Sequence, residues 1–374
     1  MNAIFNAQQR LTVAAYDEQD SILAIPFEIL RNAIAKHAFP SAAVAVVFQG
    51  KLVALKAFGR FTYESGSPEV TIAAPFDLAS VTKVVATATM AMILYERGLL
   101  DLEAPVAAIV PEFGGSDSRR KHVTVHMLLA HSSGLPAYEK LYQRASSRDE
   151  LLSAAFSTKL TADPGTRAEY SDVGFIILGA LLERIADESL DRFCQREIFG
   201  ALGMADSMFN PPVALRGSIP PTVKDCILRH RVIQGEVQDE NASMLCGVAG
   251  HAGVFSSAVD VAMFATVLSS GGCLVRPETL EIFTRRETSP PGTSRGLGWD
   301  TPSYPSQAGK YFSLRSYGHL GYTGTSLWVD PDRQLSIVLL TNRTWPDCSN
   351  QAIKTIRPAF HDAVVESLGL EATA

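Results

Sequence analysis

The stretch Phe76-Asp77-Leu78-Ala79-Ser80-Val81-Thr82-Lys83-Val84-Val85-Ala86-Thr87 carries the most informative feature of this 374-residue chain. Ser80 and Lys83 stand three residues apart at the start of a long apolar run. On a helix this spacing puts both side chains on one face, so the lysine amine can reach the serine hydroxyl. A serine hydroxyl becomes a good nucleophile when a nearby base takes its proton, and N–H groups at a helix N-terminus can stabilise an oxyanion. The pair is therefore a candidate nucleophile with its base, but Ser-x-x-Lys is common, and taken alone it favours a chance match.

Two further segments, Tyr170-Ser171-Asp172 and His319-Leu320-Gly321, follow in the chain. With Ser80-Val81-Thr82-Lys83 they resemble, in order and spacing, the three motifs of class C β-lactamases and penicillin-binding-protein-like serine hydrolases. Those motifs are Ser-x-x-Lys, then Tyr-x-Asn, then Lys-Thr-Gly or His-x-Gly; a related set is found in class A enzymes. The resemblance runs from about residue 27 to about residue 343, which is most of the chain.

The resemblance implies an α+β fold of the β-lactamase/transpeptidase type, with an antiparallel sheet flanked by helices and an inserted all-helical domain. We expect residues 1–62 and 254–374 to form the α/β domain and residues 63–253 the mainly helical one. The Ser-x-x-Lys helix would then lie at the interface, with the active site in the cleft between the domains.

Hydrophobic periodicity and turn residues predict the same distribution of elements. The almost wholly apolar run 81–96 predicts a buried helix, because a helix that is apolar on all sides has no face for water. Residues 42–48 and 52–58 read as a hairpin. Other helices are expected at 27–37, 124–130, 148–157, 172–186, 190–199, 258–269 and 350–368, and strands at 297–299, 326–330 and 335–341.

The catalytic residues implied by the motifs are Ser80, Lys83 and Tyr170. Ser80 is the nucleophile, and Lys83 is the proton acceptor or the group that tunes it, since an apolar cleft lowers the pKa of a lysine. Tyr170 would act as partner base and later as acid. The backbone N–H groups of Ser80 and Tyr322 would form the oxyanion hole, and Gly321 would let a substrate approach the strand closely.

Three positions depart from the family pattern and bear on the substrate. Asp172 replaces an asparagine and, when ionised, only accepts hydrogen bonds. It can pair with Lys83, but it offers no donor to a substrate amide. His319 stands where lysine is common and can still donate to a carboxylate or leaving group, although it carries charge only at lower pH. Leu320 replaces a threonine and offers no hydroxyl to a substrate carboxylate; whether Thr323 or Thr325 supplies one is open on the sequence. These changes rank an esterase or peptidase above an efficient β-lactamase, with carboxylic esters, D-amino-acid peptides, amides and β-lactams all open as small-molecule substrates.

Several alternatives remain open on the sequence. Ser171-Asp172-Val173 imitates the class A Ser-Asp-Asn motif, but Val173 breaks it. Gly292-Thr293-Ser294-Arg295-Gly296 matches the G-x-S-x-G of α/β-hydrolases, yet Pro290-Pro291 precede it and no helix pattern follows. A module that recognises penicillin or peptidoglycan with little turnover is the second function. His251, between two glycines, is expected to be structural.

Composition narrows the class further. The chain is 47% hydrophobic and 19% charged with a net charge of -6, so it can form a large core and has no nucleic-acid footprint. The cysteines show no metal-ligand or redox spacing, which predicts buried free thiols and no cofactor or metal. No signal peptide or membrane span is expected, which fits a cytoplasmic protein, or a periplasmic or extracellular one if a leader has been removed. The oligomeric state is left open.

Overall fold

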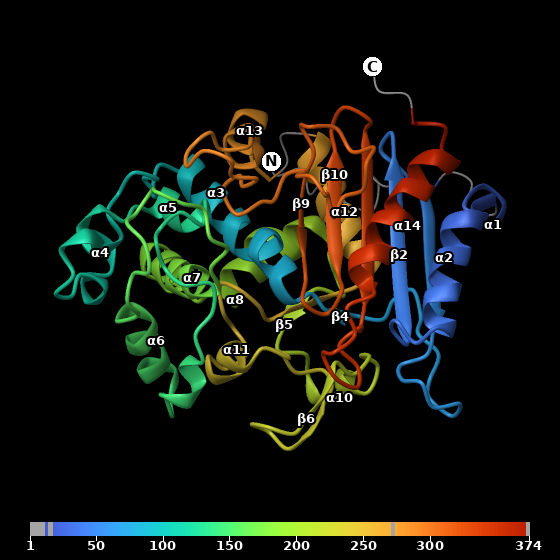
Figure 1. Cartoon of the computed structure of the whole chain (residues 1–374), viewed down its shortest axis with the longest axis horizontal. Helices are drawn as coiled ribbons and strands as arrows, with labels where there is room; N and C mark the ends of the chain where they lie inside the picture. The colour runs from blue at the N-terminus through green and yellow to red at the C-terminus, as the bar shows by residue number, and fades with distance from the viewer. Residues whose placement is uncertain (1–11, 14–17, 271–273, 372–374) are drawn as a thin grey trace, which may run out of the picture.

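The computed structural model describes residues 12–13, 18–270 and 274–371. Its main sheet has six strands in the order β1-β3-β2-β11-β10-β9, and the arrows of β9, β10 and β2 stand side by side in Figure 1. Every neighbouring pair is antiparallel except β1 and β3, which are parallel. The strands are β1 (Thr12–Val13), β2 (Ser41–Phe48), β3 (Lys51–Gly59), β9 (Tyr317–Leu320), β10 (Ser326–Asp330) and β11 (Leu335–Thr341).

Both faces of this sheet are covered by helices. Helices α2 (Ala24–Ala35) and α14 (Ile353–Ser367) pack on one face, and α12 (Ala258–Ser270) packs on the other. Strand β2 is therefore buried on both sides: Val44 belongs to the core cluster under α2 and α14, and Ala43 to the cluster under α12. A central strand without a solvent face needs no polar alternation, which explains its run of alanine and valine.

The rest of the molecule is mainly helical and lies beside the sheet in Figure 1. Its longest helix is α7 (Asp172–Ala186), which is buried along most of its length. Two small sheets join this part: β4 (Phe76–Asp77), β8 (Val254–Ser256) and β5 (Met208–Phe209), and the hairpin β6 (Val223–Asp225) and β7 (Arg231–Ile233). The other helices are α1 (Gln19–Ile22), α3 (Thr89–Glu96), α4 (Val106–Ile109), α5 (Val125–Leu129), α6 (Arg148–Phe156), α8 (Leu190–Cys194), α9 (Gly200–Leu202), α10 (Val213–Arg216), α11 (Glu240–Met244) and α13 (Pro277–Thr284).

Most of the expected elements are present, including the hairpin of β2 and β3. Its turn residues Gln49 and Gly50 have φ of 51° and 71°, the pair of positive values that suits the twist of a tight hairpin. The strand expected at 297–299 is wrong. Gly298 has φ of 88° there, and a Cβ on it would lie 2.7 Å from the Cβ of Ala88, so the chain bends around the helix that follows Lys83. Helices α1, α4, α9, α10, α11 and α13 were not expected. The division into domains at 62/63 and 253/254 stays a prediction.

The expectation of buried thiols is correct for Cys194 but wrong for Cys226 and Cys246, which are exposed. Cys226 lies in the turn between β6 and β7, and Cys246 follows α11 with φ of 59°. Cys348 is half-buried, and Cys273 lies outside the described residues. No helix in the described part of the chain is long and apolar enough to cross a membrane.

Candidate active site

Ser80 lies where an irregular turn opens the buried helix. A 3-10 turn (Ala79–Val81) leads into a π-helical segment (Lys83–Ala88) and then into α3. Ala79 has φ of 46°, a left-handed conformation that is costly for a residue with a Cβ and is concentrated at functional sites. The carboxylate of Asp77 accepts the Ala79 N–H at 2.8 Å and holds this turn. Burial raises the pKa of Asp77 to about 6.

The Lys83 amine is fully buried and faces three acceptors. Its Nζ donates to Ser80 Oγ at 3.0 Å, to Asp172 Oδ1 at 2.7 Å and to the carbonyl of His251 at 3.1 Å. Burial lowers the pKa of Lys83, and the Asp172 carboxylate acts in the opposite direction. Three acceptors match the three N–H groups of an ammonium, whereas the neutral amine can keep two bonds and turn its lone pair to Ser80.

Tyr170 reaches the same serine from the start of α7. Its hydroxyl donates to Ser80 Oγ at 2.7 Å, and the Lys83 Nζ lies 4.8 Å from the centre of its ring. Burial and the nearby Asp172 carboxylate raise the pKa of Tyr170 well above its usual value. The phenol is therefore protonated at neutral pH, and it is better suited to give a proton than to take one. Sequence reasoning placed Tyr170 first as a base.

Two histidines flank the Tyr170 ring. The ring centres of His131 and His319 lie 4.8 Å and 6.0 Å from that of Tyr170. His319 Nδ1 contacts the carbonyl of Leu320 at 2.8 Å, so this nitrogen carries the proton and Nε2 is left as an acceptor. Burial lowers the pKa of both rings well below the usual value. His319 is thus neutral, and the donor role that we expected for it does not fit this tautomer.

The turn after β9 is fastened to the Ser80 turn. Thr323 Oγ1 donates to the carbonyl of Asp77 at 2.8 Å, and Thr325 Oγ1 donates to that of Leu78 at 3.0 Å. These bonds hold the segment around Tyr322 beside Ser80. An oxyanion hole formed by the backbone N–H groups of Ser80 and Tyr322 requires this arrangement. Two buried arginines also stabilise this turn: Arg343 donates to the Tyr322 carbonyl at 2.7 Å, and Arg357 donates to the Gly324 carbonyl at 3.0 Å.

The close packing of this turn predicts a large effect of Gly321→Ala. A Cβ at Gly321 would lie 1.9 Å from Thr325 Oγ1 and 2.5 Å from the Leu78 carbonyl. We expect the turn to move away from Ser80, with a loss of about 1–3 kcal/mol of unfolding free energy and a fall in acylation rate. Thermal unfolding and ester turnover measure the two effects. Gly66→Ala is the matched control, because nothing lies within 4 Å of its Cβ; equal behaviour of both variants would contradict the prediction.

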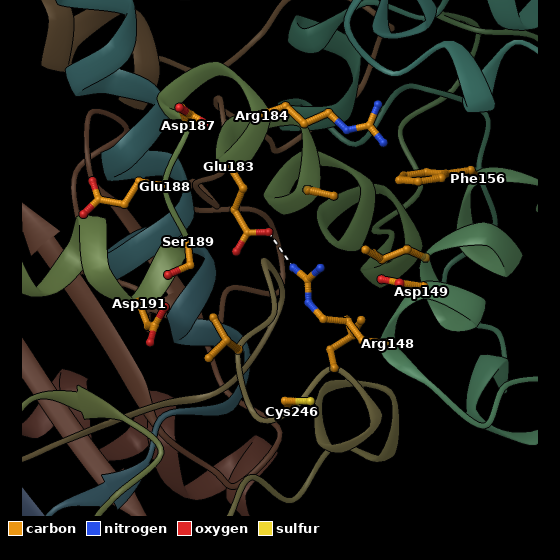
Figure 2. Close-up of a pocket in the computed structure, with 14 residues that line it drawn as sticks. Arg148, Asp149, Phe156, Glu183, Arg184, Asp187, Glu188, Ser189, Asp191 and Cys246 are labelled. Atoms are coloured by element: carbon orange, nitrogen blue, oxygen red, sulfur yellow. Dashed lines mark hydrogen bonds and ion pairs between the residues drawn. The ribbon is translucent and has the colours of Figure 1, made fainter.

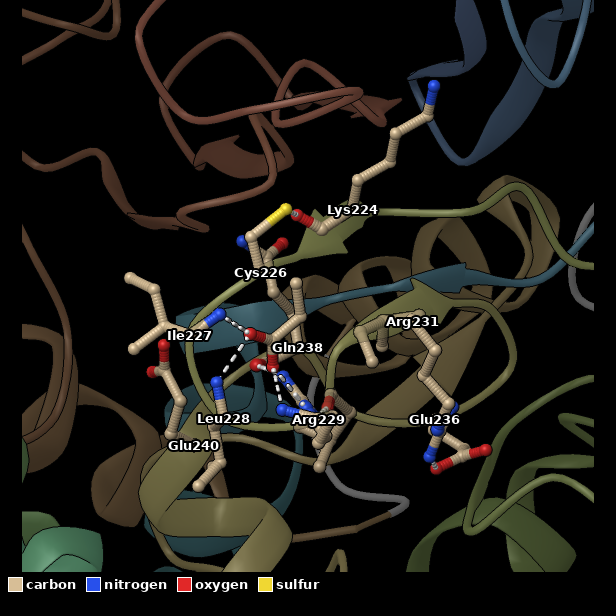
Figure 3. A network of polar contacts seen from close by, with 12 residues as sticks. Lys224, Cys226, Ile227, Leu228, Arg229, Arg231, Glu236, Gln238 and Glu240 are labelled. Carbon is tan, nitrogen blue, oxygen red and sulfur yellow. Dashed lines mark hydrogen bonds and ion pairs between the residues drawn. The ribbon is translucent and has the colours of Figure 1, made fainter.

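A network of hydrogen bonds also links the hairpin of β6 and β7 to the Ser80 turn; Figure 3 shows the part of it around Arg229 and Gln238. Asp225 accepts the N–H groups of Ile227 and Leu228, each at 2.9 Å, and pairs with the Arg229 Nε at 2.8 Å. Arg229 donates in turn to the carbonyl of Gln238 at 2.6 Å. The Gln238 N–H donates to Asp77 Oδ2 at 2.8 Å, so the network ends on the carboxylate that holds Ala79.

The residues of the alternative motifs, Ser171 and Ser294, and also His251, have structural contacts. Ser171 is buried, caps α7 by accepting the Gly174 N–H at 2.9 Å and donates to the Pro136 carbonyl. Ser294 donates to Asp300 Oδ1 at 3.0 Å, and no strand or helix of the described chain adjoins it as a nucleophile elbow needs. His251 pairs through Nε2 with Asp239 at 2.8 Å, while its carbonyl meets Lys83.

A separate hollow of about 640 Å³ lies between α6, α7, α8 and residues 245–248 (Figure 2). An ion pair lies in its wall: Glu183 accepts from Arg148 at 2.6 Å and from the Leu190 N–H at 2.9 Å. None of the residues around Ser80 lines it. The described residues also contain no cluster of histidine, cysteine and carboxylate side chains that could hold a metal ion.

A family model described as Beta-lactamase matches residues 27–357, a span that contains all three motifs. The chain belongs to the Beta-lactamase family. This Beta-lactamase-family protein is a serine hydrolase, and its antiparallel sheet with flanking helices is the fold of β-lactamases and transpeptidases. The recognition made from the three motifs is confirmed.

Relatives of this Beta-lactamase-family chain have several activities in their names. It is 30% identical over 346 residues to an N-acetylmuramyl-L-alanine amidase of Bacillus subtilis, covering 82% of this chain and 77% of that one. It is 31% identical over 356 residues to a putative D-alanyl-D-alanine carboxypeptidase of Salmonella agona, covering 84% and 81%. The solved structure of EstCE1, a hydrolase with promiscuous acyltransferase activity, matches with a TM-score of 0.77 at 20% identity, covering 92% of this chain and 99% of that one.

Proposed function

We propose that the chain hydrolyses carboxylic esters or D-amino-acid peptides through an acyl-enzyme on Ser80. The observation that carries the proposal is the contact of Ser80 Oγ with both Lys83 Nζ, at 3.0 Å, and the Tyr170 hydroxyl, at 2.7 Å. Neutral Lys83 takes the Ser80 proton as Oγ attacks the substrate carbonyl. The N–H groups of Ser80 and Tyr322 stabilise the oxyanion, and Tyr170 gives a proton to the leaving group. The Lys83 ammonium then returns a proton to Tyr170. A water molecule attacks the acyl carbonyl, its proton goes back to Ser80 Oγ, and the acid is released.

The substrate ranking rests on two positions, one in the second motif and one in the third. Asp172 replaces a side chain that could donate to a substrate amide, and Leu320 has no hydroxyl for a substrate carboxylate. We therefore place ester and peptide hydrolysis ahead of efficient β-lactam hydrolysis. The names of the amidase and carboxypeptidase relatives support an amide or peptide substrate.

Covalent labelling tests the proposal directly. Wild type is mixed with a p-nitrophenyl ester, nitrocefin or a D-Ala-D-Ala peptide, quenched in acid, and measured by intact mass and by peptide mapping. We expect an acyl adduct on the peptide that contains Ser80, together with turnover of the ester or peptide. An adduct on the peptide that contains Ser294, or turnover without any adduct on Ser80 in rapid-quench samples, would contradict the mechanism.

A recognition module with slow turnover is the second candidate. The 2.7 Å ion pair between Lys83 and Asp172 favours it, because the carboxylate stabilises the protonated amine. This candidate predicts a stable Ser80 adduct with penicillins and almost no release over hours in the same mass measurement.

The two states of Lys83 also predict a pH dependence. Only the neutral amine accepts a proton, so kcat/KM should rise with pH and level off below the ordinary lysine pKa, because burial lowers the pKa of Lys83. Asp172→Asn removes the charge that raises this pKa, so the rising limb should move to lower pH. A pH–rate profile of a neutral ester measures both. A limb that stays in place or moves upward in Asp172→Asn would show that another group titrates.

A further inference from the structure

A hollow away from the catalytic residues has the size of a ligand site. Its volume is about 640 Å³, within the range of about 300–1,000 Å³ that is typical of small-molecule pockets. Helices α6, α7 and α8 and the segment 245–248 line it, as Figure 2 shows. Ser80, Lys83 and Tyr170 are not part of this lining, so the proposed reaction leaves the hollow without a role.

The walls of the hollow are held in place by hydrogen bonds. Glu183 of α7 accepts from Arg148 of α6 at 2.6 Å and from the N–H of Leu190 of α8 at 2.9 Å, which fixes the three helices against one another. The remaining wall is fixed by Asn210, whose Nδ2 donates to the Cys246 carbonyl at 2.8 Å. A pocket that is already formed costs a ligand little conformational ordering.

The floor of the hollow is apolar. Phe156 and Leu245 are buried there, and Leu152 and Val248 are partly buried against the same core. At its inner end the hollow shares six lining residues with a narrow space of about 10 Å³ that reaches Gly179, which is room for one water-sized group. Because water gains few hydrogen bonds on an apolar surface, an apolar group of a ligand displaces it favourably.

Both cations in the lining already have carboxylate partners. Arg148 pairs with Glu183, and Arg184 donates through both terminal nitrogens to Glu112 at 2.8 Å. An anionic ligand would have to compete with these carboxylates, so the two arginines do not make the hollow an anion site.

Three carboxylates of the lining lack such partners. Asp149, Asp187 and Asp191 form no ion pair and no side-chain hydrogen bond within the described residues. Figure 2 shows Asp149 on one side of the hollow and Asp187 and Asp191 on the other. Their charges therefore flank the apolar floor from two sides, and a negative potential over a low-dielectric floor attracts a cation.

We propose that this hollow is a second binding site, which takes an organic cation with an apolar body. The body rests on the floor formed by Phe156 and Leu245, and the charged group lies between Asp149 and the pair Asp187 and Asp191. The three features are needed together, since surface carboxylates without a hollow hold only water and an apolar hollow alone has no preference for charge. The site does not depend on the acyl-enzyme at Ser80.

Three ligands with a phenylalkyl body test the proposal: 4-phenylbutyltrimethylammonium, 4-phenylbutanol and 4-phenylbutyrate, which are cationic, neutral and anionic. Isothermal titration calorimetry measures their affinities. We expect wild type to bind the ammonium about tenfold more tightly than the other two, because three partly exposed charge pairs together contribute a preference of about this size. Added salt should weaken the preference.

The cysteines of the chain locate the bound ligand. Cys246 is exposed and belongs to the lining, whereas Cys226 is exposed but lies outside it. Alkylation with N-ethylmaleimide, followed by peptide mapping, measures the rate at each thiol. The ammonium should slow the alkylation of Cys246, because it covers this thiol, and leave that of Cys226 unchanged.

Removal of the three unpaired carboxylates tests their role. Asp149→Asn/Asp187→Asn/Asp191→Asn should lower the affinity for the ammonium to that for the alcohol, while the affinity for the alcohol stays the same. A purely structural role of these side chains would change both affinities. Thermal unfolding checks that the variant is folded, and the comparison of the three ligands on wild type does not depend on it.

A second triple variant is the matched control. Glu278, Glu281 and Glu371 are exposed, lie outside the lining and form no ion pair in the part of the chain that the structure describes. Glu278→Gln/Glu281→Gln/Glu371→Gln therefore makes the same change in net charge and should keep the preference. Equal affinity of wild type for all three ligands would overturn the proposal, as would binding of the ammonium without an effect on Cys246. An equal loss of affinity in both triple variants would assign the preference to net charge and overturn it too.

Discussion

Ser80→Ala is expected to lower kcat for ester or peptide hydrolysis by about 10⁴-fold or more, because loss of a nucleophile removes the covalent route. The nearby hydroxyls of Ser171 and Thr323 are engaged elsewhere: Ser171 caps α7, and the Thr323 hydroxyl is bound to the Asp77 carbonyl. The mass adduct found on wild type should also disappear. Initial rates with the wild-type substrate and intact mass after rapid quench measure both.

The fold should survive this change. Lys83 keeps two of its three acceptors, the Asp172 carboxylate and the His251 carbonyl, so thermal unfolding of Ser80→Ala should stay close to that of wild type. Ser294→Ala is the control for the second serine motif and should keep full activity. Turnover in Ser80→Ala that equals wild type, with loss of turnover in Ser294→Ala, would refute the mechanism and move the site to another loop.

The local part of the site was predictable from the sequence. A spacing of three residues on a helix suffices to bring Lys83 to Ser80, and the almost wholly apolar run after Lys83 predicted the burial that lowers the pKa of Lys83. The π-helical segment was not predictable, since nothing in the run distinguishes it from an α-helix. Tyr170 lies 90 residues from Ser80, so only the resemblance to a family could place it there.

The residues that were missed share one cause: their roles depend on tertiary contacts that a single sequence does not encode locally. Arg295, whose Cζ lies 5.4 Å from the centre of the Tyr170 ring, is part of the G-x-S-x-G match around Ser294, and nothing local in that segment indicates its contact with Tyr170. Arg343 and Arg357 are both buried, and a buried arginine normally has fixed partners. Their sequence neighbours include polar residues such as Asn342, Thr344 and Lys354, so the local sequence indicated neither the burial nor the Tyr322 and Gly324 carbonyls as acceptors.

The third motif also shows that hydrogen-bonding roles depend on tertiary contacts. Leu320 correctly indicated that the third motif lacks a hydroxyl, and the sequence left open whether Thr323 or Thr325 would supply one. Their bonds to the Ser80 turn exclude this. The sequence predicted that His319 would donate a hydrogen bond to the substrate. In the structure its Nδ1–H is bound to the Leu320 carbonyl, so the free nitrogen, Nε2, is an acceptor. A motif thus gives the position of a side chain more reliably than its protonation.

Lys83→Met is expected to lower kcat/KM by about 10³-fold, the range of a lost general base, and also to destabilise the protein. The side chain of Asp172 is 19% exposed and that of Lys83 is fully buried, so removing the amine leaves a carboxylate with little water and no cation. Such a half-broken pair costs about 1–3 kcal/mol at this exposure. Thermal unfolding should therefore show a lower Tm for Lys83→Met than for wild type.

The double variant Lys83→Met/Asp172→Asn separates the two effects. Asparagine removes the unpaired charge, so the double variant should unfold at a higher temperature than Lys83→Met, while its kcat/KM should stay as low because the base is still absent. Asp172→Asn alone completes the cycle, in which a coupling energy between the two positions is measured directly. If the double variant were as unstable as Lys83→Met, the cost would come from lost packing around the buried amine and not from the charge. Activity that returned with stability would mean that Lys83 acts only as a structural partner of Asp172, and Tyr170 would then have to take the proton from Ser80 despite its raised pKa.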